Sequence, residues 1–214
     1  MMINTGKIIY VDFCNTITNF TTLTPFYNYL FAKKKRQLVK NFIHRVASNL
    51  FNLSLGEQQL KMIAGMRQSE IDTLSRNFFD ECIKPHLNHD VIQIVKKYHA
   101  NGYAVVIVSG GLTEYIRYIS DFMPVTEVIA KKFRYRNGRI TPEYMDAPCY
   151  YHDKVLRMER FEQALNREII DRVAISDCED DIPMLLYANT RFVVRPINEE
   201  FRKFVERKKW TIIE

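Results

Sequence analysis

Three groups of potentially reactive residues each follow a short apolar run of the sequence. A carboxylate follows the first run, a serine and two glycines follow the second, and a cluster of acids follows the third. Carboxylates from separate segments repel one another unless a cation lies between them, and hard oxygen ligands suit Mg²⁺. A glycine turn that opens a helix offers backbone N–H groups to an anion. A metal beside an anion site suggests a phosphate ester as the substrate. The residues are Asp12, Ser109, Gly110, Gly111, Asp177, Glu179, Asp180 and Asp181.

A parallel β-sheet is the predicted scaffold that brings these residues together. Four apolar runs, each ending in a polar cluster, are typical of buried parallel strands. A helical pattern from Val91 to Tyr98 is followed by Gly102, where a C-terminal cap is expected. Alternating strands and helices predict a doubly wound α/β fold, in which ligands bind beyond the carboxyl ends of the strands. The four runs are 8–11, 103–108, 172–175 and 191–194.

Residues 19–84 interrupt this alternation and are predicted to form an inserted group of helices. Apolar residues recur there at four-residue intervals, and no strand pattern lies between them. The predicted domains are therefore a core of residues 1–18 and 85–214 and a helical insertion of residues 19–84. The recurring residues are Leu38, Phe42, Val46 and Leu50.

Local signals predict where some of these elements begin and turn. A capping-box pattern starts at Ser54 and a weaker one at Ser69, so a helix is predicted to begin at each. Between residues 133 and 141, Asn137-Gly138 lies between short alternating segments, which predicts a tight β-hairpin.

Taken in order, the motifs resemble those of the haloacid dehalogenase superfamily. They are an Asp-Phe-Cys-Asn-Thr-Ile-Thr segment, the Ser-Gly-Gly segment, a lysine on a later helix, and an acidic segment that begins Ser-Asp-Cys-Glu-Asp-Asp. The helical insertion directly after the first motif resembles the phosphoserine-phosphatase-like branch. The hairpin is similar to the flap of that branch, and residues 195–210 are similar to its C-terminal ending. The resemblance covers the whole chain and implies a Rossmann-like core with a helical cap. The motifs lie at 12–18, 109–111, Lys154 and 176–184.

This resemblance implies a phosphoaspartate mechanism with Mg²⁺ as the cofactor. Asp12 would be the nucleophile that attacks phosphorus, and Lys154 would neutralise charge beside it. Asp12, the backbone carbonyl of Cys14 and Asp177 would hold Mg²⁺, and Asp181 would support them from close by. Such a transfer needs positioning and charge neutralisation, which a metal, a lysine and oriented amides provide. The phosphate oxygens would be bound by Ser109, Gly110 and Gly111.

Cys14 departs from the pattern of the hydrolytic members, which place a second Asp two residues after the nucleophile as general acid and base. A neutral thiol, with an ordinary pKa of ~8.5, is a poor proton acceptor near neutrality. Losing general acid–base assistance typically lowers the rate about 10²–10⁴-fold. We therefore expect Mg²⁺ and phosphate to bind while ordinary phosphate monoesters are hydrolysed slowly. The alternative is a catalytically impaired regulatory protein that keeps the phosphate and metal site. A dehalogenase is a third reading, against which the Mg²⁺-type carboxylates Asp177 and Asp181 argue.

The inserted helices are expected to form a cap whose inner face selects a small phosphorylated substrate. In phosphoserine phosphatases this region supplies a Glu and an Arg that grip the amino acid. Thr21 and Ile63 stand at the matching positions of this sequence, which argues against phosphoserine as the substrate.

The charge of the chain is unevenly distributed. The formal net charge is +6, and no acidic residue occurs from Phe13 to Gly56. A basic run such as the one in this segment is most often the solvated face of a helix. Two more specific alternatives are attraction of an anionic substrate to the cap and weak contact with an anionic membrane surface, since apolar residues precede the run. Nucleic acid is not expected as a partner, since no groove-reading motif or stacking platform accompanies the charge. The run consists of Lys33, Lys34, Lys35 and Arg36.

The 214 residues, of which 47% are hydrophobic and 26% charged, have the ordinary balance of a globular chain. The uncharged stretch from Phe13 to Ala32 contains five Thr, three Asn and a Pro, so it is not expected to cross a membrane. With no signal-peptide pattern at the N-terminus, a cytoplasmic location is predicted. The four cysteines lack C-x-x-C spacing and are expected to be reduced thiols. The sequence leaves the oligomeric state open.

Overall fold

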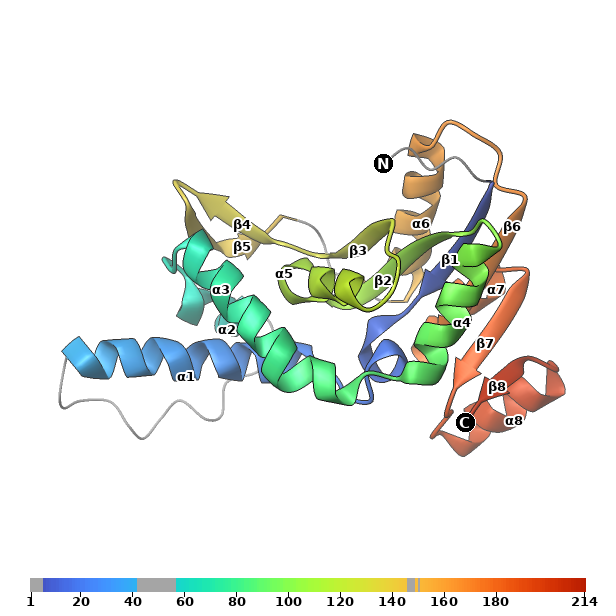
Figure 1. Cartoon of the computed structure of the whole chain (residues 1–214), viewed down its shortest axis with the longest axis horizontal. Helices are drawn as coiled ribbons and strands as arrows, with labels where there is room; N and C mark the ends of the chain where they lie inside the picture. The colour runs from blue at the N-terminus through green and yellow to red at the C-terminus, as the bar shows by residue number, and fades with distance from the viewer. Residues whose placement is uncertain (1–5, 42–56, 146–148, 150) are drawn as a thin grey trace.

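A six-stranded parallel sheet forms the centre of the protein in the computed structural model (Figure 1), which describes residues 6–41, 57–145, 149 and 151–214, without the side chains of 35–41, 57 and 58. The strand order is β3-β2-β1-β6-β7-β8. Every neighbouring pair of this sheet runs parallel, which confirms the predicted doubly wound fold. The strands are β1 (Lys7–Val11), β2 (Ala104–Leu112), β3 (Glu127–Lys131), β6 (Asp171–Ser176), β7 (Thr190–Val194) and β8 (Thr211–Ile213).

The second strand differs from the sequence-based expectation. The residues Ser109-Gly110-Gly111 were expected to form a turn that opens a helix, but they lie inside β2, and the next helix begins only at Thr113. The pairing of β2 with β3 shifts register between Val108 and Leu112, so the chain bulges at this point. Glycine permits such a bulge, since it has no Cβ that must be accommodated.

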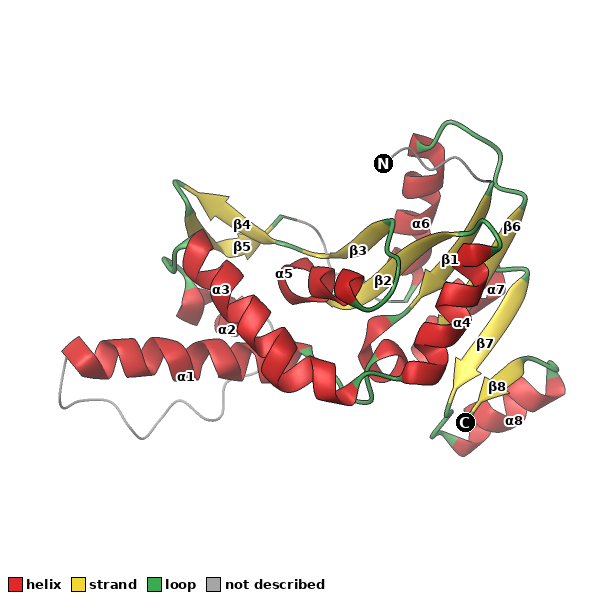
Figure 2. Ribbon diagram, viewed as in Figure 1, coloured by secondary structure: helices red, strands yellow, loops and turns green. Residues whose placement is uncertain are grey.

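Helices cover both faces of the sheet (Figure 2). Alternate residues of β1 point to opposite sides: Ile9 and Val11 belong to one hydrophobic cluster, and Ile8 and Tyr10 belong to the other. Each fully buried aliphatic or aromatic side chain contributes roughly 1.5–3 kcal/mol, so the two clusters hold β1 firmly at the centre. The flanking helices are α4 (His89–Ala100), α5 (Thr113–Ile116), α6 (His152–Ala164), α7 (Ile182–Tyr187) and α8 (Glu199–Arg207).

The predicted end of α4 is confirmed. The side chain of Asn88 caps its first turn by accepting from the backbone N–H groups of Asp90 and Val91. Gly102, with a φ of +85°, follows its last turn and donates its N–H to the carbonyl of His99. Glycine adopts this left-handed conformation without steric cost, which ends the helix where the sequence predicted.

The inserted segment contains α1 (Leu23–Asn41), α2 (Glu57–Ile63) and α3 (Gln68–Phe78), followed by the turns Phe79–Ile83 and Lys84–His86. The four-residue repeat that predicted a helix lies outside the described residues, except for the backbone of Leu38 in α1. Ser54 also lies outside them. A further expectation was wrong. Helix α3 begins at Gln68, with Arg67 in the capping position, so Ser69 lies inside the helix.

Strands β4 (Phe133–Arg136) and β5 (Arg139–Tyr144) form the predicted antiparallel hairpin. Asn137 and Gly138 both have a positive φ, as a type I′ turn requires.

The hairpin is joined to the inserted helices by backbone hydrogen bonds. Gly65 N donates to Ile140 O, Ile140 N donates to Met66 O, and Gln68 N donates to Gly138 O. This pairing sets where α3 begins, because the backbone entering the helix is held by the hairpin. The hairpin and the insertion therefore form one side of the molecule, seen at the left of Figure 1.

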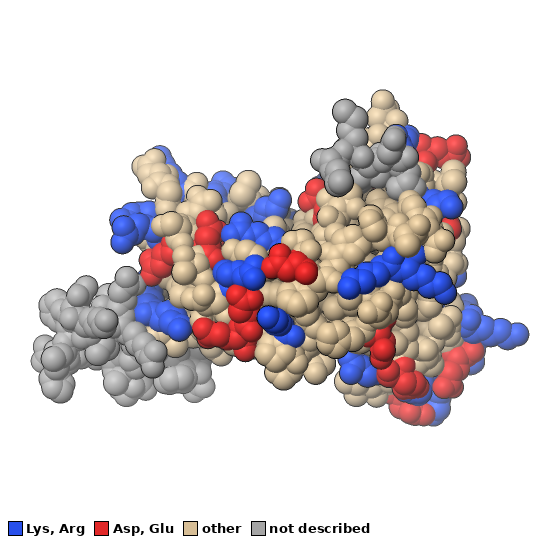
Figure 3. Space-filling model, viewed as in Figure 1, with Lys and Arg blue, Asp and Glu red and all other residues tan. Residues whose placement is uncertain are grey.

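Within the described residues, none of the helices is both long and apolar enough to cross a bilayer. Positive and negative side chains alternate over α3 and α5 on the face shown in Figure 3. Arg76 pairs with Asp121 at 2.6 Å, and Arg117 pairs with Asp72 at 2.9 Å, so exposed ion pairs link α3 to the segment after α5. Such exposed pairs contribute little to stability individually.

Candidate active site

Asp12 lies at the centre of the carboxyl edge of the sheet. It directly follows β1, and its backbone N–H donates to Ile175 O of β6 at 2.9 Å. Asp12 is only 5% exposed. The chain then makes a wide turn over residues 13–17, in which Asn15 has a φ of 54°. This turn leaves the Asp12 carboxylate beyond the end of the strand, where open α/β sheets bind ligands.

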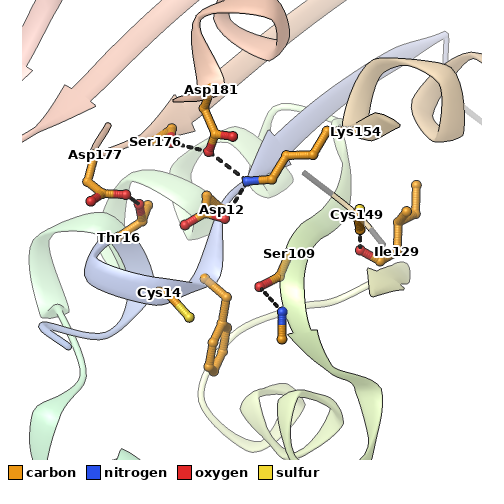
Figure 4. A network of polar contacts seen from close by, with 12 residues as sticks. Asp12, Cys14, Thr16, Ser109, Ile129, Cys149, Lys154, Ser176, Asp177 and Asp181 are labelled. Carbon is orange, nitrogen blue, oxygen red and sulfur yellow. Dashed lines mark hydrogen bonds and ion pairs between the residues drawn. The ribbon is translucent and has the colours of Figure 1, made fainter. Parts of the chain in front are cut away.

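Lys154, in the first turn of α6, joins two of the predicted carboxylates. Its ammonium donates to Asp12 Oδ1 at 2.7 Å and to Asp181 Oδ2 at 2.6 Å (Figure 4). Ser176 Oγ donates to the same oxygen of Asp181 at 2.5 Å. All of these side chains are buried. The structure thus brings together Asp12, Lys154 and Asp181, as expected, and adds Ser176, which the sequence analysis included in a motif without assigning it a role.

The buried carboxylates of the site raise one another's pKa values by charge repulsion. Burial raises the pKa of the Asp12 carboxyl to about 7, although Lys154 opposes this shift; Asp181 and Asp177 raise it further. Burial also raises the pKa of Asp177 to about 6, while a hydrogen bond from Thr16 opposes the change. For Lys154, burial alone would lower the pKa, but the facing carboxylates Asp12 and Asp181 more than reverse this and raise it. The Lys154 ammonium therefore contacts two of the three carboxylates of the site, and Asp177 lies outside that contact.

The carboxylates of Asp12, Asp177 and Asp181 are the donors that this site offers to Mg²⁺. In the described part of the chain, no three His, Cys, Asp or Glu side chains form a ready-made metal cage. Asp12 and Asp181 turn to Lys154, and Asp177 accepts from Thr16 Oγ1 at 3.2 Å (Figure 4). The surplus of negative charge, all on hard oxygen atoms, nevertheless suits a divalent cation, which completes its coordination with carbonyl groups and water. The residues fit Mg²⁺ by charge and by ligand type.

Ser109 lies on the other side of Asp12 from the acidic cluster, and its side chain is fully buried. Its hydroxyl accepts from the N–H of Gly111 at 3.1 Å, which holds the bulge at the end of β2 in shape. A Cβ at Gly111 would lie 2.6 Å from the hydroxyl of Tyr115, so any larger residue would force the buried Tyr115 side chain to move. The Ser109-Gly110-Gly111 segment, which the sequence predicts to bind phosphate, therefore lies in a strand bulge at the edge of the sheet.

Cys14 has a hydrogen-bonded environment that the sequence analysis did not foresee. Its sulfur lies 3.2 Å from Thr22 Oγ1, and Thr22 Oγ1 lies 2.8 Å from the hydroxyl of Tyr115. Burial, together with the neighbouring Asp12, raises the pKa of the thiol to about 11. The thiol is therefore neutral near pH 7. The contact between Thr22 and Tyr115 has no signal in the sequence, because the two residues are 93 positions apart.

The two positions compared with phosphoserine phosphatases lie in different surroundings. Thr21 is exposed, whereas Ile63 is fully buried in the hydrophobic core. An isoleucine in the core has no polar group to offer a ligand.

Two side chains of the basic run are described, and both contact the protein itself. Lys33 Nζ lies 4.9 Å from the centre of the Tyr29 ring. Lys34 Nζ donates to Met62 O at 2.6 Å and to Ala64 O at 3.4 Å, at the end of α2. Lys34 therefore helps to satisfy the last carbonyl groups of that helix. The side chains of Lys35 and Arg36 lie outside the described residues.

Comparison with known proteins agrees with this geometry. A sequence model of the haloacid dehalogenase-like hydrolases matches residues 9–186. The phosphoserine phosphatase of Lactococcus lactis subsp. lactis (strain IL1403) is 27% identical over 131 residues. These residues are 61% of this chain and 61% of that protein, so the match spans less than two thirds of either.

Solved structures show the same fold. A protein of unknown function from Bordetella pertussis Tohama I superposes with a TM-score of 0.76 at 18% identity, over 97% of this chain and 98% of that one. A structure described as the phospho-aspartyl intermediate analogue of phosphoserine phosphatase superposes with a TM-score of 0.60 at 16% identity, over 96% and 91%.

Proposed function

The chain belongs to the haloacid dehalogenase-like hydrolases, and from this premise we propose that it is a Mg²⁺-dependent phosphatase or phosphotransferase that forms an aspartyl-phosphate on Asp12. The observation that supports this most directly is the buried contact of Lys154 with both Asp12 and Asp181 at the carboxyl edge of the sheet. A carboxylate held in place by a buried ammonium is suited to attack phosphorus, because it is already oriented and partly desolvated.

The residues of the chain would divide the work as follows. Ser109, Gly110 and Gly111 bind the phosphoryl oxygens and orient phosphorus toward Asp12. Lys154 neutralises the charge that develops between Asp12 and the phosphoryl group. Asp12, the Cys14 carbonyl and Asp177, with support from Asp181, would hold Mg²⁺, which when bound would further neutralise phosphoryl charge.

Cys14 limits the reaction. The neutral thiol lies where a carboxyl group would protonate the leaving group and then deprotonate water. The high thiol pKa makes it a weak donor near neutrality. Loss of such assistance lowers the rate about 10²–10⁴-fold, so ordinary monoesters are poor substrates and esters with good leaving groups suffer least.

The substrate is a small phosphorylated metabolite other than phosphoserine. Thr21 is exposed and Ile63 is buried in the core. Neither side chain carries a charge that could bind the amino and carboxyl groups of phosphoserine, which supports a different substrate. Residues 19–84 act as the cap of a core formed by residues 1–18 and 85–214. The backbone pairing of Gly65 and Met66 with Ile140 supports a cap that closes together with the hairpin.

An aryl phosphate with a good leaving group, assayed with Mg²⁺, tests the proposal. The wild-type protein should release product, and Asp12→Asn should abolish release while leaving the fold intact. A radioactive phosphoryl group should remain on the denatured wild-type protein and be absent from Asp12→Asn. If the wild-type protein binds Mg²⁺ and phosphate but neither releases product nor becomes labelled, the regulatory alternative replaces the enzyme.

A further inference from the structure

Lys131 ends β3 at the same edge of the sheet as the site. Its backbone pairs in register with Leu112, directly after the Ser109-Gly110-Gly111 bulge of the neighbouring strand β2. The residue is only 5% exposed. Removing an ammonium from water is costly, so burial favours the neutral form of this lysine.

The surroundings of Lys131 place it where three parts of the molecule meet. Its ammonium lies 5.2 Å from the centre of the Tyr144 ring, on the hairpin strand β5. The hydroxyl of Tyr144 is hydrogen-bonded to that of Tyr27, on the inserted helix α1. The ring of Tyr144 also stacks on Phe133, with centroids 6.2 Å apart. The side chain of Lys131 thus lies at the carboxyl edge of the sheet, at the junction of the core, the hairpin and the inserted helix α1.

Charged and titratable groups around Lys131 connect it to the reactive centre. Burial lowers the pKa of Lys131 to about 8. Thiolate charge on Cys149, before α6, or on Cys14 would raise this pKa, and Arg157 on α6 lowers it. The ammonium is therefore within electrostatic reach of Cys14, the residue at the position of the missing acid.

We propose that Lys131 is a catalytic residue that carries out, more slowly than a carboxyl group would, the proton transfers for which Cys14 is unsuited. This inference rests on the proposed phosphatase function. In the first half-reaction, an Asp12 oxygen bonds to phosphorus, the bond from phosphorus to the leaving oxygen breaks, and the Lys131 ammonium gives that oxygen a proton. In the second half-reaction, a water oxygen bonds to phosphorus, the neutral Lys131 amine takes a proton from that water, and the bond between Asp12 and phosphorus breaks. One ester and one water give one alcohol and one phosphate, and Lys131 regains its proton.

The other candidates for these transfers are less suitable. Lys154 is held between Asp12 and Asp181, and these carboxylates raise its pKa, so it gives up a proton reluctantly. The pKa of the Cys14 thiol, about 11, also makes it a weak donor. A proton-transfer group works best when its pKa is close to the operating pH, as that of Lys131 is.

Substitution of Lys131 by methionine, which removes the charge and keeps much of the volume, tests the proposal with Mg²⁺ present. Turnover of an alkyl phosphate, whose leaving oxygen needs a proton, should fall about 10²-fold or more. Turnover of an activated aryl phosphate should change little, because its leaving group departs without a proton. The matched control is Lys132→Met, which removes the same charge from the adjacent, half-buried lysine and should leave both substrates unaffected. Equal loss with both substrates, or alkyl turnover equal to that of the wild-type protein, would overturn the proposal.

A charge-preserving variant separates proton transfer from simple charge stabilisation. Lys131→Arg keeps the positive charge, but a guanidinium does not give up a proton near neutrality. Alkyl phosphate turnover should remain as low as in Lys131→Met, and the wild-type decline in alkyl turnover above about pH 8 should be absent. Thermal unfolding of both variants checks that they are folded. Full recovery of alkyl turnover in Lys131→Arg would contradict a proton-transfer role.

A double substitution ties Lys131 to Cys14. In a Cys14→Asp background, a carboxyl group can resume both proton transfers, so Lys131→Met should lower alkyl turnover far less than it does alone. Equal effects in both backgrounds would contradict the proposal. Asp12→Asn distinguishes this failure from failure of the proposed function: if that variant still turns over the aryl phosphate, the phosphoaspartate mechanism itself is wrong, whatever Lys131 does.

Discussion

Lys154 Nζ lies 2.7 Å from Asp12 Oδ1 although 142 residues separate the two in the sequence. Both side chains are at least 93% buried, with exposures of 5% and 7%. An ion pair so far from water is sustained only when its geometry is good and further hydrogen bonds satisfy its members. Asp181 meets that condition, since it accepts from the same ammonium.

Lys154→Met should destabilise the metal-free protein in a pH-dependent way. It would leave Asp12 and its neighbouring carboxylates without their counter-charge, which typically costs about 3–5 kcal/mol. The pKa of Asp12, already about 7, should rise further. Because a raised carboxyl pKa favours the folded state at low pH, the loss should be larger at pH 8 than at pH 5.5. Urea unfolding at both pH values measures this, and a loss independent of pH would argue against the electrostatic cause.

In a Lys131→Met background, Cys14→Asp should speed the hydrolysis of alkyl phosphates about 10²–10⁴-fold, because it supplies a carboxyl group for proton transfer where no other group does so. Aryl phosphates with good leaving groups should gain little. Steady-state kinetics with a series of leaving groups measures the difference. Cys14→Ser, which adds no carboxyl group, is the control and should give no such gain. Unchanged alkyl turnover in Cys14→Asp would show that the residue at this position does not limit the reaction.

Glu114 should make the stability of the protein fall as the pH rises. The residue is 8% exposed, and burial raises its pKa from 4.5 to about 7, although the Phe133 N–H donates to its carboxylate. Between pH 4.5 and pH 7, Glu114 is therefore protonated in the folded state and ionised in the unfolded state. This difference stabilises the folded state at low pH, and the stabilisation is lost as the pH rises through 7.

Replacement of Glu114 by glutamine should remove this dependence. Between pH 5 and pH 8, Glu114→Gln should gain up to ~3 kcal/mol in unfolding free energy relative to the wild-type protein, by linkage of the pKa shift. Denaturant titrations at the two pH values measure the gain. The control is Glu127→Gln, at an exposed position of β3. Its unfolding free energy should change with pH in the same way as that of the wild-type protein. A gain at pH 5 rather than pH 8 would reverse the sign and refute the assignment.

Gly111→Ala should lower the unfolding free energy by about 1–3 kcal/mol, because the new methyl group would overlap the hydroxyl of Tyr115. The cost should shrink in a Tyr115→Phe background, which removes that hydroxyl. A double-mutant cycle of unfolding free energies measures the coupling, with Tyr115→Phe alone as the reference. Strictly additive effects would show that the alanine clashes elsewhere.

The basic run of α1 should bind anionic vesicles weakly through Lys33, Lys35 and Arg36. Lys34 serves as the internal control, because its ammonium is already used by the carbonyl groups at the end of α2. In flotation assays at low salt, replacing the first three by alanine should abolish binding, whereas Lys34→Ala should retain most of it. Binding that persists in high salt would exclude the electrostatic contact, since exposed charges are screened.

Local patterns in the sequence were enough to determine the strands around Asp12, the end of α4 at Gly102, the Asn137-Gly138 turn and the order of the motifs. Each depends on residues within about one turn or one strand, where side-chain periodicity and backbone preference act directly. The partners of these residues were decided only by the tertiary structure. The contacts of Lys154 with Asp12 and Asp181, the contact of Thr22 with Tyr115, and the burial of Lys131 all depend on segments that are distant in the chain. The start of α3 and the strand bulge at Ser109 were misjudged for the same reason: pairing with the hairpin and with β3 overrode the local signals.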